Sequence, residues 1–520
     1  MPAYLQQHLQ QVKQSPVAIT LKSLQCGIEK EGLRVDLSGR VSHKDHPLSL
    51  GSSLTHGSIT TDYSEALLEY ITPVFQSPTA ALDFMQQLHS YSASKLQGLG
   101  EYVWPASMPC YLDGEDDIRI ADFGSSNTGK LKHTYRVGLA WRYGKTMQSI
   151  AGLHFNFSPQ DHFWPAYQQL LNNEQTLRDF RSSQYFGLIR NFRRHSWILL
   201  YLFGASPALD SSFVKGREID LEEGPDGCLI GPYATSLRMS DLGYNNKAQS
   251  VLNLCFNHLD TYAKSLEHAI STPLSQYENI GVKVDGAYRQ LNANLLQIEN
   301  EYYSDIRPKR VARAGQKPVH ALKESGVEYV EVRNIDLNPF LPLGIDAQQS
   351  QFINVFLCWC LFDQSPEISD QECDLIKTNQ AVVVRQGRKP GLMLGTCSGP
   401  KSLQSLGFEM ISKLRLVVDV MPDKTEVLEA IDAMEARLKD SSLTPSAQVL
   451  EAMVNGNLSH QALSFKLAQQ HQAYHLEQSL SPHRQQELSE QVTASIAHQQ
   501  RIEAEQTEPF DDFLAAYLAQ

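Results

Sequence analysis

The chain has 520 residues and a formal net charge of −13 at pH 7. Hydrophobic residues make up 42% of it and charged residues 20%, which excludes a disordered chain and is ordinary for a folded protein with a large core. The acidic balance argues against nucleic acid as the main partner, because phosphate backbones are bound by basic surfaces. An anionic substrate would therefore need a local basic pocket or bound cations.

The cysteines and the apolar runs indicate the cellular compartment in which the protein works. The eight cysteines are scattered, with no CxxC pair, and several lie in apolar surroundings such as 357–361. Because this pattern is typical of reduced, buried thiols, we expect a cytoplasmic protein. The N-terminus MPAYLQQHLQQVKQ lacks the apolar run of a signal peptide. The longest apolar stretches, Trp197–Leu209 and Phe352–Phe362, are too short to cross a bilayer and predict buried helices, so no membrane partner is expected.

Hydrophobic periodicity predicts a mixed α+β chain without internal repeats. In chain order it favours an extended Cys26–Val35, a short helix Tyr63–Ile71, a strand Gly152–Ser158, mainly helix over 160–270, strands and loops over 277–345, and helix from Ser402 onward. All candidate chemistry lies before residue 345. We therefore expect a catalytic region over 1–401 and a helical C-terminal region over 402–520 packed on it.

Two acidic segments come early in the chain. On a strand, Glu29 and Glu31 project from the same face, and two adjacent carboxylates repel unless a proton or a cation lies between them. If Asp62 caps a helix, Glu65 and Glu69 share a face one turn apart. Each segment alone is more often a solvated edge or a capped surface helix.

Two later strands carry polar groups opposite an apolar face. His154 and Asn156 alternate with aromatic residues, and Glu331 and Arg333 alternate with valines. A structural histidine and a structural ion pair are the plain alternatives. Taken together, the segments offer several carboxylates and one imidazole, which suit magnesium or manganese rather than zinc or copper. A magnesium cluster needs a polyanion to bridge, usually a nucleoside triphosphate.

One motif is rejected. Gly124–Lys130 has the GxxxxGK spacing of a phosphate-binding loop, but Leu131 stands where the loop needs a Ser or Thr hydroxyl. The segment is better explained as a turn that delivers Tyr135, Arg136 and Leu139 into a pocket.

Basic and donor-rich segments could neutralise an anion. Arg307–Arg313 is the densest basic run, and it suits a loop against phosphate or carboxylate as well as a solvated surface loop. The segment 233–244 is dense in donors, with Arg238 and Tyr244 its notable members. An ordinary surface loop remains the alternative there.

Over nearly its whole length, the chain resembles the proteobacterial glutamate–cysteine ligases (gamma-glutamylcysteine synthetases) of the glutamine-synthetase-like superfamily. The matching segments are GIEKEGLRV, LTHGSITTDYSEALLEYITP, WPASMPCY, GSSNTGKLKHTYRVGL, RYG, GLHFNFS, YLFGASPA, PYATSLRMSDLGY, LQIENEYYSDIRPKR, VEYVEVRNIDLNPF and GRKPGL. The C-terminal helical region matches more loosely.

The resemblance implies an α+β fold in which a curved antiparallel sheet forms a funnel backed by helices. It implies a cytoplasmic monomer that joins the γ-carboxylate of glutamate to cysteine with Mg²⁺ or Mn²⁺ and ATP, through γ-glutamyl phosphate, with possible feedback inhibition by glutathione. The family's metal ligands fall on Glu29, Glu31, Asp62, Glu69, His154 and Glu331. Its arginines fall on Arg333, expected at the nucleotide phosphates, and on Arg136 and Arg238, expected at substrate carboxylates or the transferred phosphoryl group. Its cysteine pocket falls on Tyr63, Tyr135, Leu139, Tyr244 and Tyr303.

Three positions depart from the family pattern. Lys30 and Gly32 differ from the expected residues of the first motif, and Tyr63 stands where Phe is common, so a hydroxyl at that wall could alter selectivity for the small thiol. Two alternatives stay open: a related carboxylate–amine ligase that uses another amine, and a non-catalytic binding relative. The second predicts the loss of a metal ligand, and none is lost.

Overall fold

The fold is built on one antiparallel sheet. The structure is a computed structural model that describes residues 2–243, 252, 254–313 and 315–520. The main path of the sheet is β11-β12-β5-β1-β3-β2, and β4 pairs with the end of β1. Its seven strands are β1 (Leu24–Asp36), β2 (Ile59–Thr61), β3 (Leu67–Ile71), β4 (Glu101–Val103), β5 (Leu153–Pro159), β11 (Ile306–Lys309) and β12 (Tyr329–Ile335).

Strand β1 is the spine of the sheet. Over 13 residues it pairs with β5 along one edge and with β3 and β4 along the other. The predicted strands Cys26–Val35 and Gly152–Ser158 are both confirmed. Because side chains alternate along a strand, β1 presents carboxylates to one face of the sheet and Ile28 and Lys30 to the other.

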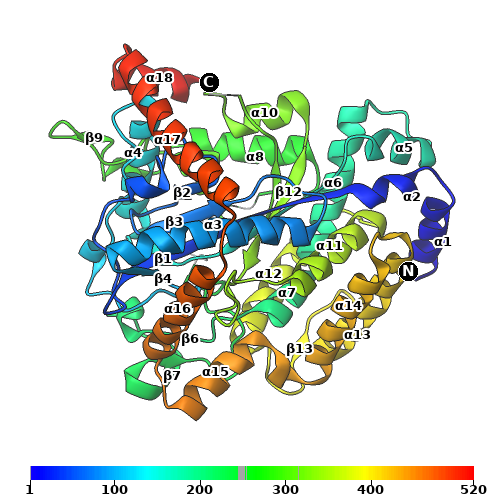
Figure 1. The fold of residues 1–520 in the computed structure, drawn as a ribbon. Helices are drawn as coiled ribbons and strands as arrows, with labels where there is room; N and C mark the ends of the chain where they lie inside the picture. The colour runs from blue at the N-terminus through cyan, green and yellow to red at the C-terminus, as the bar shows by residue number, and fades with distance from the viewer. Residues whose placement is uncertain (1, 244–251, 253, 314) are drawn as a thin grey trace.

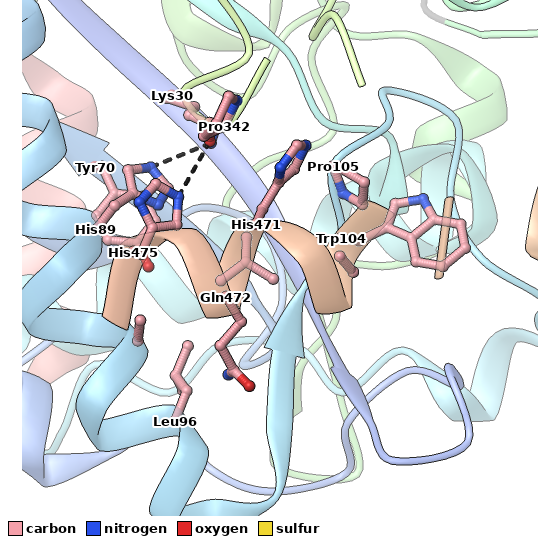
Figure 2. A pocket seen from close by; sticks show the side chains of 13 residues that line it. Lys30, Tyr70, His89, Leu96, Trp104, Pro105, Pro342, His471, Gln472 and His475 are labelled. Atoms are coloured by element: carbon pink, nitrogen blue, oxygen red, sulfur yellow. Dashed lines mark hydrogen bonds between the residues drawn. The ribbon is translucent and has the colours of Figure 1, made fainter. Parts of the chain in front are cut away.

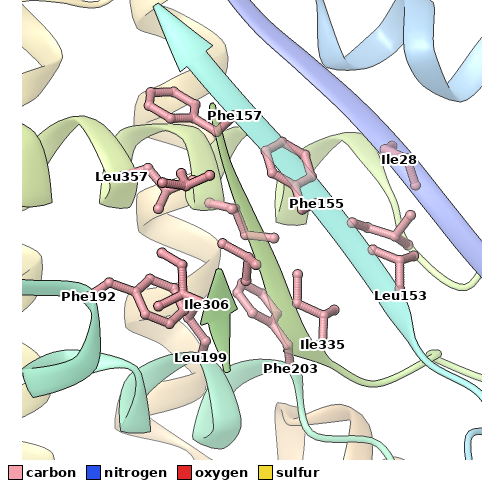
Figure 3. Packing of buried hydrophobic residues seen from close by; sticks show 14 of the residues in the cluster. Ile28, Leu153, Phe155, Phe157, Phe192, Leu199, Phe203, Ile306, Ile335 and Leu357 are labelled. Atoms are coloured by element: carbon pink, nitrogen blue, oxygen red, sulfur yellow. The ribbon is translucent and has the colours of Figure 1, made fainter. Parts of the chain in front are cut away.

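Helices cover the apolar face of the sheet. Leu153, Phe155 and Phe157 of β5 are fully buried there, and Figure 3 shows them packed with Ile306, Ile335 and residues of helices α6, α7 and α11. The α+β class is therefore confirmed (Figure 1). The helices of the first 401 residues are α1 (Pro2–Lys13), α2 (Val17–Thr20), α3 (Pro78–Leu99), α4 (Asn127–Tyr143), α5 (Phe163–Leu170), α6 (Leu177–His195), α7 (Trp197–Phe203), α8 (Leu259–Ser271), α9 (Ser275–Glu278), α10 (Pro318–Ser325), α11 (Ala347–Phe362) and α12 (Asp370–Gln386).

The two apolar runs fold differently. Phe352–Phe362 is the buried end of α11, as predicted. The other run was only partly predicted, because its helix α7 ends at Phe203 and Ala208–Leu209 forms strand β6. The short strands outside the main sheet are β6, β7 (Glu222–Glu223), β8 (Leu229–Ile230), β9 (Lys283–Val284), β10 (Ala287–Tyr288), β13 (Met393–Leu394) and β14 (Lys401–Ser402).

The predicted helix Tyr63–Ile71 is wrong. The chain turns after Asp62, whose backbone N–H bonds to Leu67 O at 2.9 Å, and then forms strand β3. The backbone groups of β3 are satisfied on both edges, because it pairs with β1 and with β2. Pairing with two existing strands outweighs the local helical spacing of Glu65 and Glu69.

The C-terminal helices pack around the sheet and its helices. They are α13 (Leu403–Val417), α14 (Lys424–Lys439), α15 (Pro445–Gly456), α16 (His460–Glu477), α17 (Pro482–Glu505) and α18 (Phe510–Ala519). Helices α13 and α14 pack on α11, α16 packs on α3, and α18 packs on α4. The helical region from Ser402 is confirmed, whereas the domain boundary at 401/402 stays a prediction. Among the described helices, none is long and apolar enough to cross a membrane.

The cysteines are free thiols, and five of the eight are buried. Burial raises the pKa of Cys26 to about 12. A buried thiol held in its neutral form is a poor nucleophile, so these residues act as small apolar groups of the core.

Candidate active site

A cavity of about 370 Å³ opens on the polar face of the sheet. Twelve of the fourteen residues predicted for the site line it. They come from every strand between β12 and β3, from the turn after β2, from helix α4 and from the segment before β11. The twelve are Glu29, Glu31, Asp62, Tyr63, Glu69, Tyr135, Arg136, Leu139, His154, Tyr303, Glu331 and Arg333.

The sheet register brings the acids around one imidazole. Glu29 lies opposite His154 on β5, and Glu31 lies opposite Glu69 on β3. His154 Nδ1 is 3.2 Å from Glu29 Oε2 and 3.9 Å from Glu331 Oε1, and its Nε2 is 3.7 Å from Glu31 Oε1. Three neighbouring strands therefore direct four ionisable groups to one point.

These groups form two overlapping sets that suit divalent cations. Ligand atoms of Glu29, His154 and Glu331 lie within 4.8 Å of one another, and so do those of Glu31, Glu69 and His154. The donors are carboxylate oxygens with one imidazole nitrogen, which hard cations such as Mg²⁺ and Mn²⁺ prefer. Asp62 stands at the edge of the second set, with its side chain 43% exposed.

The acids of the second set repel one another. Burial, reinforced by the charges of Asp62, Glu29 and Glu31, raises the pKa of Glu69 well above its ordinary value. Burial also raises the pKa of Glu31, against the opposing charge of His154. An unneutralised cluster of this kind is what a bound cation would stabilise, so the residues fit a metal site.

The first set has cations of its own. Lys309 Nζ lies 3.3 Å from Glu331 Oε1, and Arg333 Nη1 donates to Glu331 Oε2 at 2.9 Å. Although burial opposes ionisation, these two charges hold the pKa of Glu331 well below its ordinary value. The predicted pairing of Glu331 with Arg333 on one face of β12 is confirmed.

Helix α4 forms a wall of the cavity beside Asp62. It begins inside the rejected GxxxxGK motif, where Ser126 Oγ accepts from Gly129 N at 3.1 Å, and Lys130 is exposed. The expected turn is therefore a capped helix, which carries Tyr135, Arg136 and Leu139 to the cavity. No strand leads into the motif in the described chain, which agrees with its rejection.

Arg136 and Tyr63 lie together at this wall. Arg136 Nε donates to the backbone oxygen of Asp62, and its Nη2 lies 3.7 Å from Asp62 Oδ1. Tyr63 is 1% exposed, and burial raises its pKa. The tyrosine next to the acids therefore stays neutral and offers a donor.

Two predicted residues need separate comment. Arg238 is not among the residues that line the cavity: it is buried, donates to the backbone oxygen of Arg333 at 3.0 Å and lies 3.6 Å from Asp336 Oδ1. Its charge nevertheless acts on Glu31 and Tyr303, so Arg238 lies next to the cavity as well as against strand β12. Tyr244 lies outside the described residues.

The cavity also holds residues that the sequence did not single out. Arg307 and Lys309 belong to the basic run, but the expected loop there begins as strand β11. Their alternation on a strand could have identified them. Gln148, Asn300 and Glu301 also line the cavity. Asn300 and Glu301 belong to a segment that carries the family resemblance, whereas Gln148 carried no specific signal.

An antiparallel sheet with a carboxylate-lined polar face and arginines beside it is the arrangement expected of a carboxylate–amine ligase of the glutamine-synthetase-like class. A family model described as glutamate–cysteine ligase matches residues 9–383. The glutamate–cysteine ligases of Pseudomonas putida and Pseudomonas aeruginosa are each 48% identical, over 96% and 95% of this chain and 95% and 94% of theirs. The chain belongs to the glutamate–cysteine ligase family.

Solved structures agree with this assignment. The crystal structure of glutamate–cysteine ligase from Francisella tularensis in complex with AMP matches with a TM-score of 0.90 and 34% identity, over 96% of this chain and 98% of that one. A bifunctional glutathione synthetase from Pasteurella multocida matches with a TM-score of 0.72 and 27% identity, over 91% of this chain and 54% of that one.

Proposed function

We propose that this protein joins the γ-carboxylate of glutamate to the amine of cysteine at the expense of ATP, the first step of glutathione synthesis, as a cytoplasmic monomer. The observation that carries the proposal is the single cavity in which all six expected metal ligands meet. The similarity of the chain to a ligase solved in complex with AMP supports ATP as the co-substrate. Glutathione, as a γ-glutamyl peptide, would compete for the same cavity.

The carboxylates would hold the metal ions. Glu29, His154 and Glu331 would form one site, and Glu31, Asp62 and Glu69 the other. Bound Mg²⁺ or Mn²⁺ would neutralise phosphate and carboxylate charge as a Lewis acid.

The protein's own cations complete the charge balance. The γ-carboxylate oxygen attacks the γ-phosphorus of ATP, the bond to ADP breaks, and γ-glutamyl phosphate forms. Arg333 and Arg136 would stabilise the charge spread over the transferring oxygens and hold the substrate carboxylates. Arg238, which donates to the backbone oxygen of Arg333 and whose charge acts on Glu31, would contribute at the substrate carboxylates or the transferred phosphoryl group.

The second half of the reaction depends more on how the substrates are positioned than on acid–base catalysis. The cysteine amine attacks the acyl carbon, phosphate leaves, and the amine loses a proton. Tyr63, Tyr135, Leu139 and Tyr303 would enclose the small side chain, with Tyr244 as a further wall. Burial raises the pKa of Tyr135 and of Tyr303, so these rings stay neutral against the substrate. Holding the amine next to the acyl phosphate accelerates the attack through proximity and orientation.

ADP release tests the proposal. With ATP, Mg²⁺ and glutamate, we expect turnover with cysteine and with 2-aminobutyrate, which has a similar size, and little with alanine or ammonia. Glu331→Gln should lower the rate at least about 100-fold, because it removes a charged metal ligand. Glu328→Gln is the matched control, since Glu328 pairs with Arg310 and is not among the residues lining the cavity. Folded, metal-loaded protein without amine-dependent ADP release would overturn the proposal.

A further inference from the structure

A buried lysine lies directly behind the metal ligands. Lys30 stands between Glu29 and Glu31 on β1, and its side chain points to the other face of the sheet. There it lines a small cavity with His89 of α3 and with His471 and His475 of α16 (Figure 2). Lys30 is 3% exposed.

The amine of Lys30 has neutral partners. Its Nζ donates to Pro342 O at 3.1 Å and lies 3.2 Å from His89 Nε2. The residue is 3% exposed, and among the described residues no carboxylate forms an ion pair with it. A buried amine without a counter-charge is costly, and an apolar side chain of similar volume would fill the site more cheaply. Lys30 therefore contributes something other than core stability.

Helix α16 reaches the same segment of backbone. His475 Nε2 lies 3.3 Å from Pro342 O, and Gln86 Nε2 donates to His475 Nδ1 at 2.9 Å, so the ring proton belongs on Nε2. His471 Nε2 donates to Pro339 O at 2.8 Å. The carbonyls of Pro339 and Pro342 thus receive donors from the C-terminal region.

These contacts join two ligand-bearing strands. Pro339 and Pro342 belong to the segment that follows β12, which carries Glu331, whereas Lys30 belongs to β1. Strand β5 lies between β1 and β12 in the sheet. The proline segment, Lys30 and α16 therefore connect β1 and β12, the two ligand-bearing strands on either side of β5.

We infer that Lys30, His471 and His475 are positioning residues that set the spacing of the metal ligands on β1 and β12 from the opposite side of the sheet. The C-terminal helix α16 is then part of the architecture of the catalytic cavity. This inference rests on the proposed function, because only a metal bound by these ligands gives their spacing a consequence.

Metal affinity tests the inference without turnover. Lys30→Met keeps the side-chain volume and removes the donor to Pro342. The affinity of the nucleotide-free protein for Mn²⁺ should therefore fall about 10-fold. Titration with Mn²⁺, in which electron paramagnetic resonance reports the free ion, measures this affinity. Lys30→Arg keeps a donor and should restore affinity to within about threefold of the natural protein. Gln470→Ala, on the exposed side of α16, is the control and should change nothing.

A second variant covers the case in which Lys30→Met folds poorly. His475→Leu removes the other donor to Pro342 and should weaken Mn²⁺ binding by a similar factor. Because both donors act on one carbonyl, the double variant should lose less than the product of the two single losses. Folded Lys30→Met or His475→Leu protein with unchanged Mn²⁺ affinity would overturn the inference. Absent Mn²⁺ binding and ligase activity in the natural protein would instead refute the proposed function.

Discussion

At the scale of single residues, the carboxylate of Glu331 already has two cations beside it. Lys309 is 28% exposed at its side chain, whereas Glu331 is 1% exposed, so the lysine is the partner that is free to move. If a divalent cation binds the carboxylate of Glu331, Lys309 loses its ion-pair partner. Its ammonium group can then bind an anionic phosphate. A charged hydrogen bond of this kind contributes about 1.5–3 kcal/mol.

Lys309→Gln should therefore raise the KM for ATP about 10-fold and leave the KM for cysteine within about twofold. Initial rates at varied ATP and varied cysteine measure both constants. Lys309→Arg keeps the charge and serves as the control. Equal increases in both constants would show that Lys309 supports the cavity generally and does not contact the nucleotide.

The sequence predicted residue types better than directions. Alternation on a strand assigned a face to Glu29, Glu31, His154, Glu331 and Arg333, and that rule needs no tertiary contact. Asp62 and Glu69 were instead singled out from a helical spacing that the structure does not have. Arg238 lies in a loop, where no periodicity assigns a direction, and the structure bonds it to the backbone of β12. Lys309 was recognised only as part of a basic run, because its place on β11 follows from pairing with β12.

At the scale of elements, the mistaken helix shows the same limit. The spacing of Asp62, Glu65 and Glu69 suits a helix, yet the chain forms β3 because β1 and β2 offer pairing on both of its edges. Strand β1 was predicted as the extended segment Cys26–Val35, and it spans 13 residues in the structure. Short elements depend on their neighbours, and a single sequence does not show which neighbours they meet.

Helix α4 gives an element-scale prediction. A Cβ at Gly138 would overlap Gln297 Oε1, and Gln297 is buried with that oxygen accepting from Leu291 N at 2.9 Å. Although alanine favours helix by about 1 kcal/mol, Gly138→Ala should lower the free energy of unfolding by about 1–3 kcal/mol, because it displaces this amide. Urea denaturation measures the change.

Helix α3 supplies the matched control for this substitution. Gly98 is exposed, and a Cβ there meets no atom within 4 Å. Gly98→Ala should raise the free energy of unfolding by about 0.5–1 kcal/mol. If both variants shift stability in the same direction, packing against Gln297 is not what requires glycine in α4.

At the scale of the whole molecule, buried neutral histidines make stability depend on pH. Burial lowers the pKa of His46 and of His475 to about 3, and that of His89 well below its ordinary value. They face other basic groups, which reinforce the shift: Arg34 and His56 around His46, and Lys30 and His471 around His475. In the unfolded chain each ring titrates near 6.5.

Below pH 6.5 each of these rings binds a proton in the unfolded state and none in the folded state, so each makes stability fall as the pH falls. Near pH 5.5 one such ring contributes a slope of about 1.4 kcal/mol per pH unit. Urea midpoints at pH 7.0, 6.0 and 5.0 measure this slope. Ion-paired carboxylates with lowered pKa values lose their contribution mainly below pH 4, outside this window.

One substitution isolates the contribution of a single buried histidine to the pH dependence of stability. His46→Leu removes one buried ring without touching the catalytic cavity, so it should reduce the slope between pH 6 and pH 5 by about 1.4 kcal/mol per pH unit. Its stability at pH 7 should change little, since His46 is already neutral there. An unchanged slope would mean that the His46 ring keeps its proton in the folded state. Glu65, which accepts a hydrogen bond from the His46 backbone N–H at 2.6 Å, would then be the acid to substitute next.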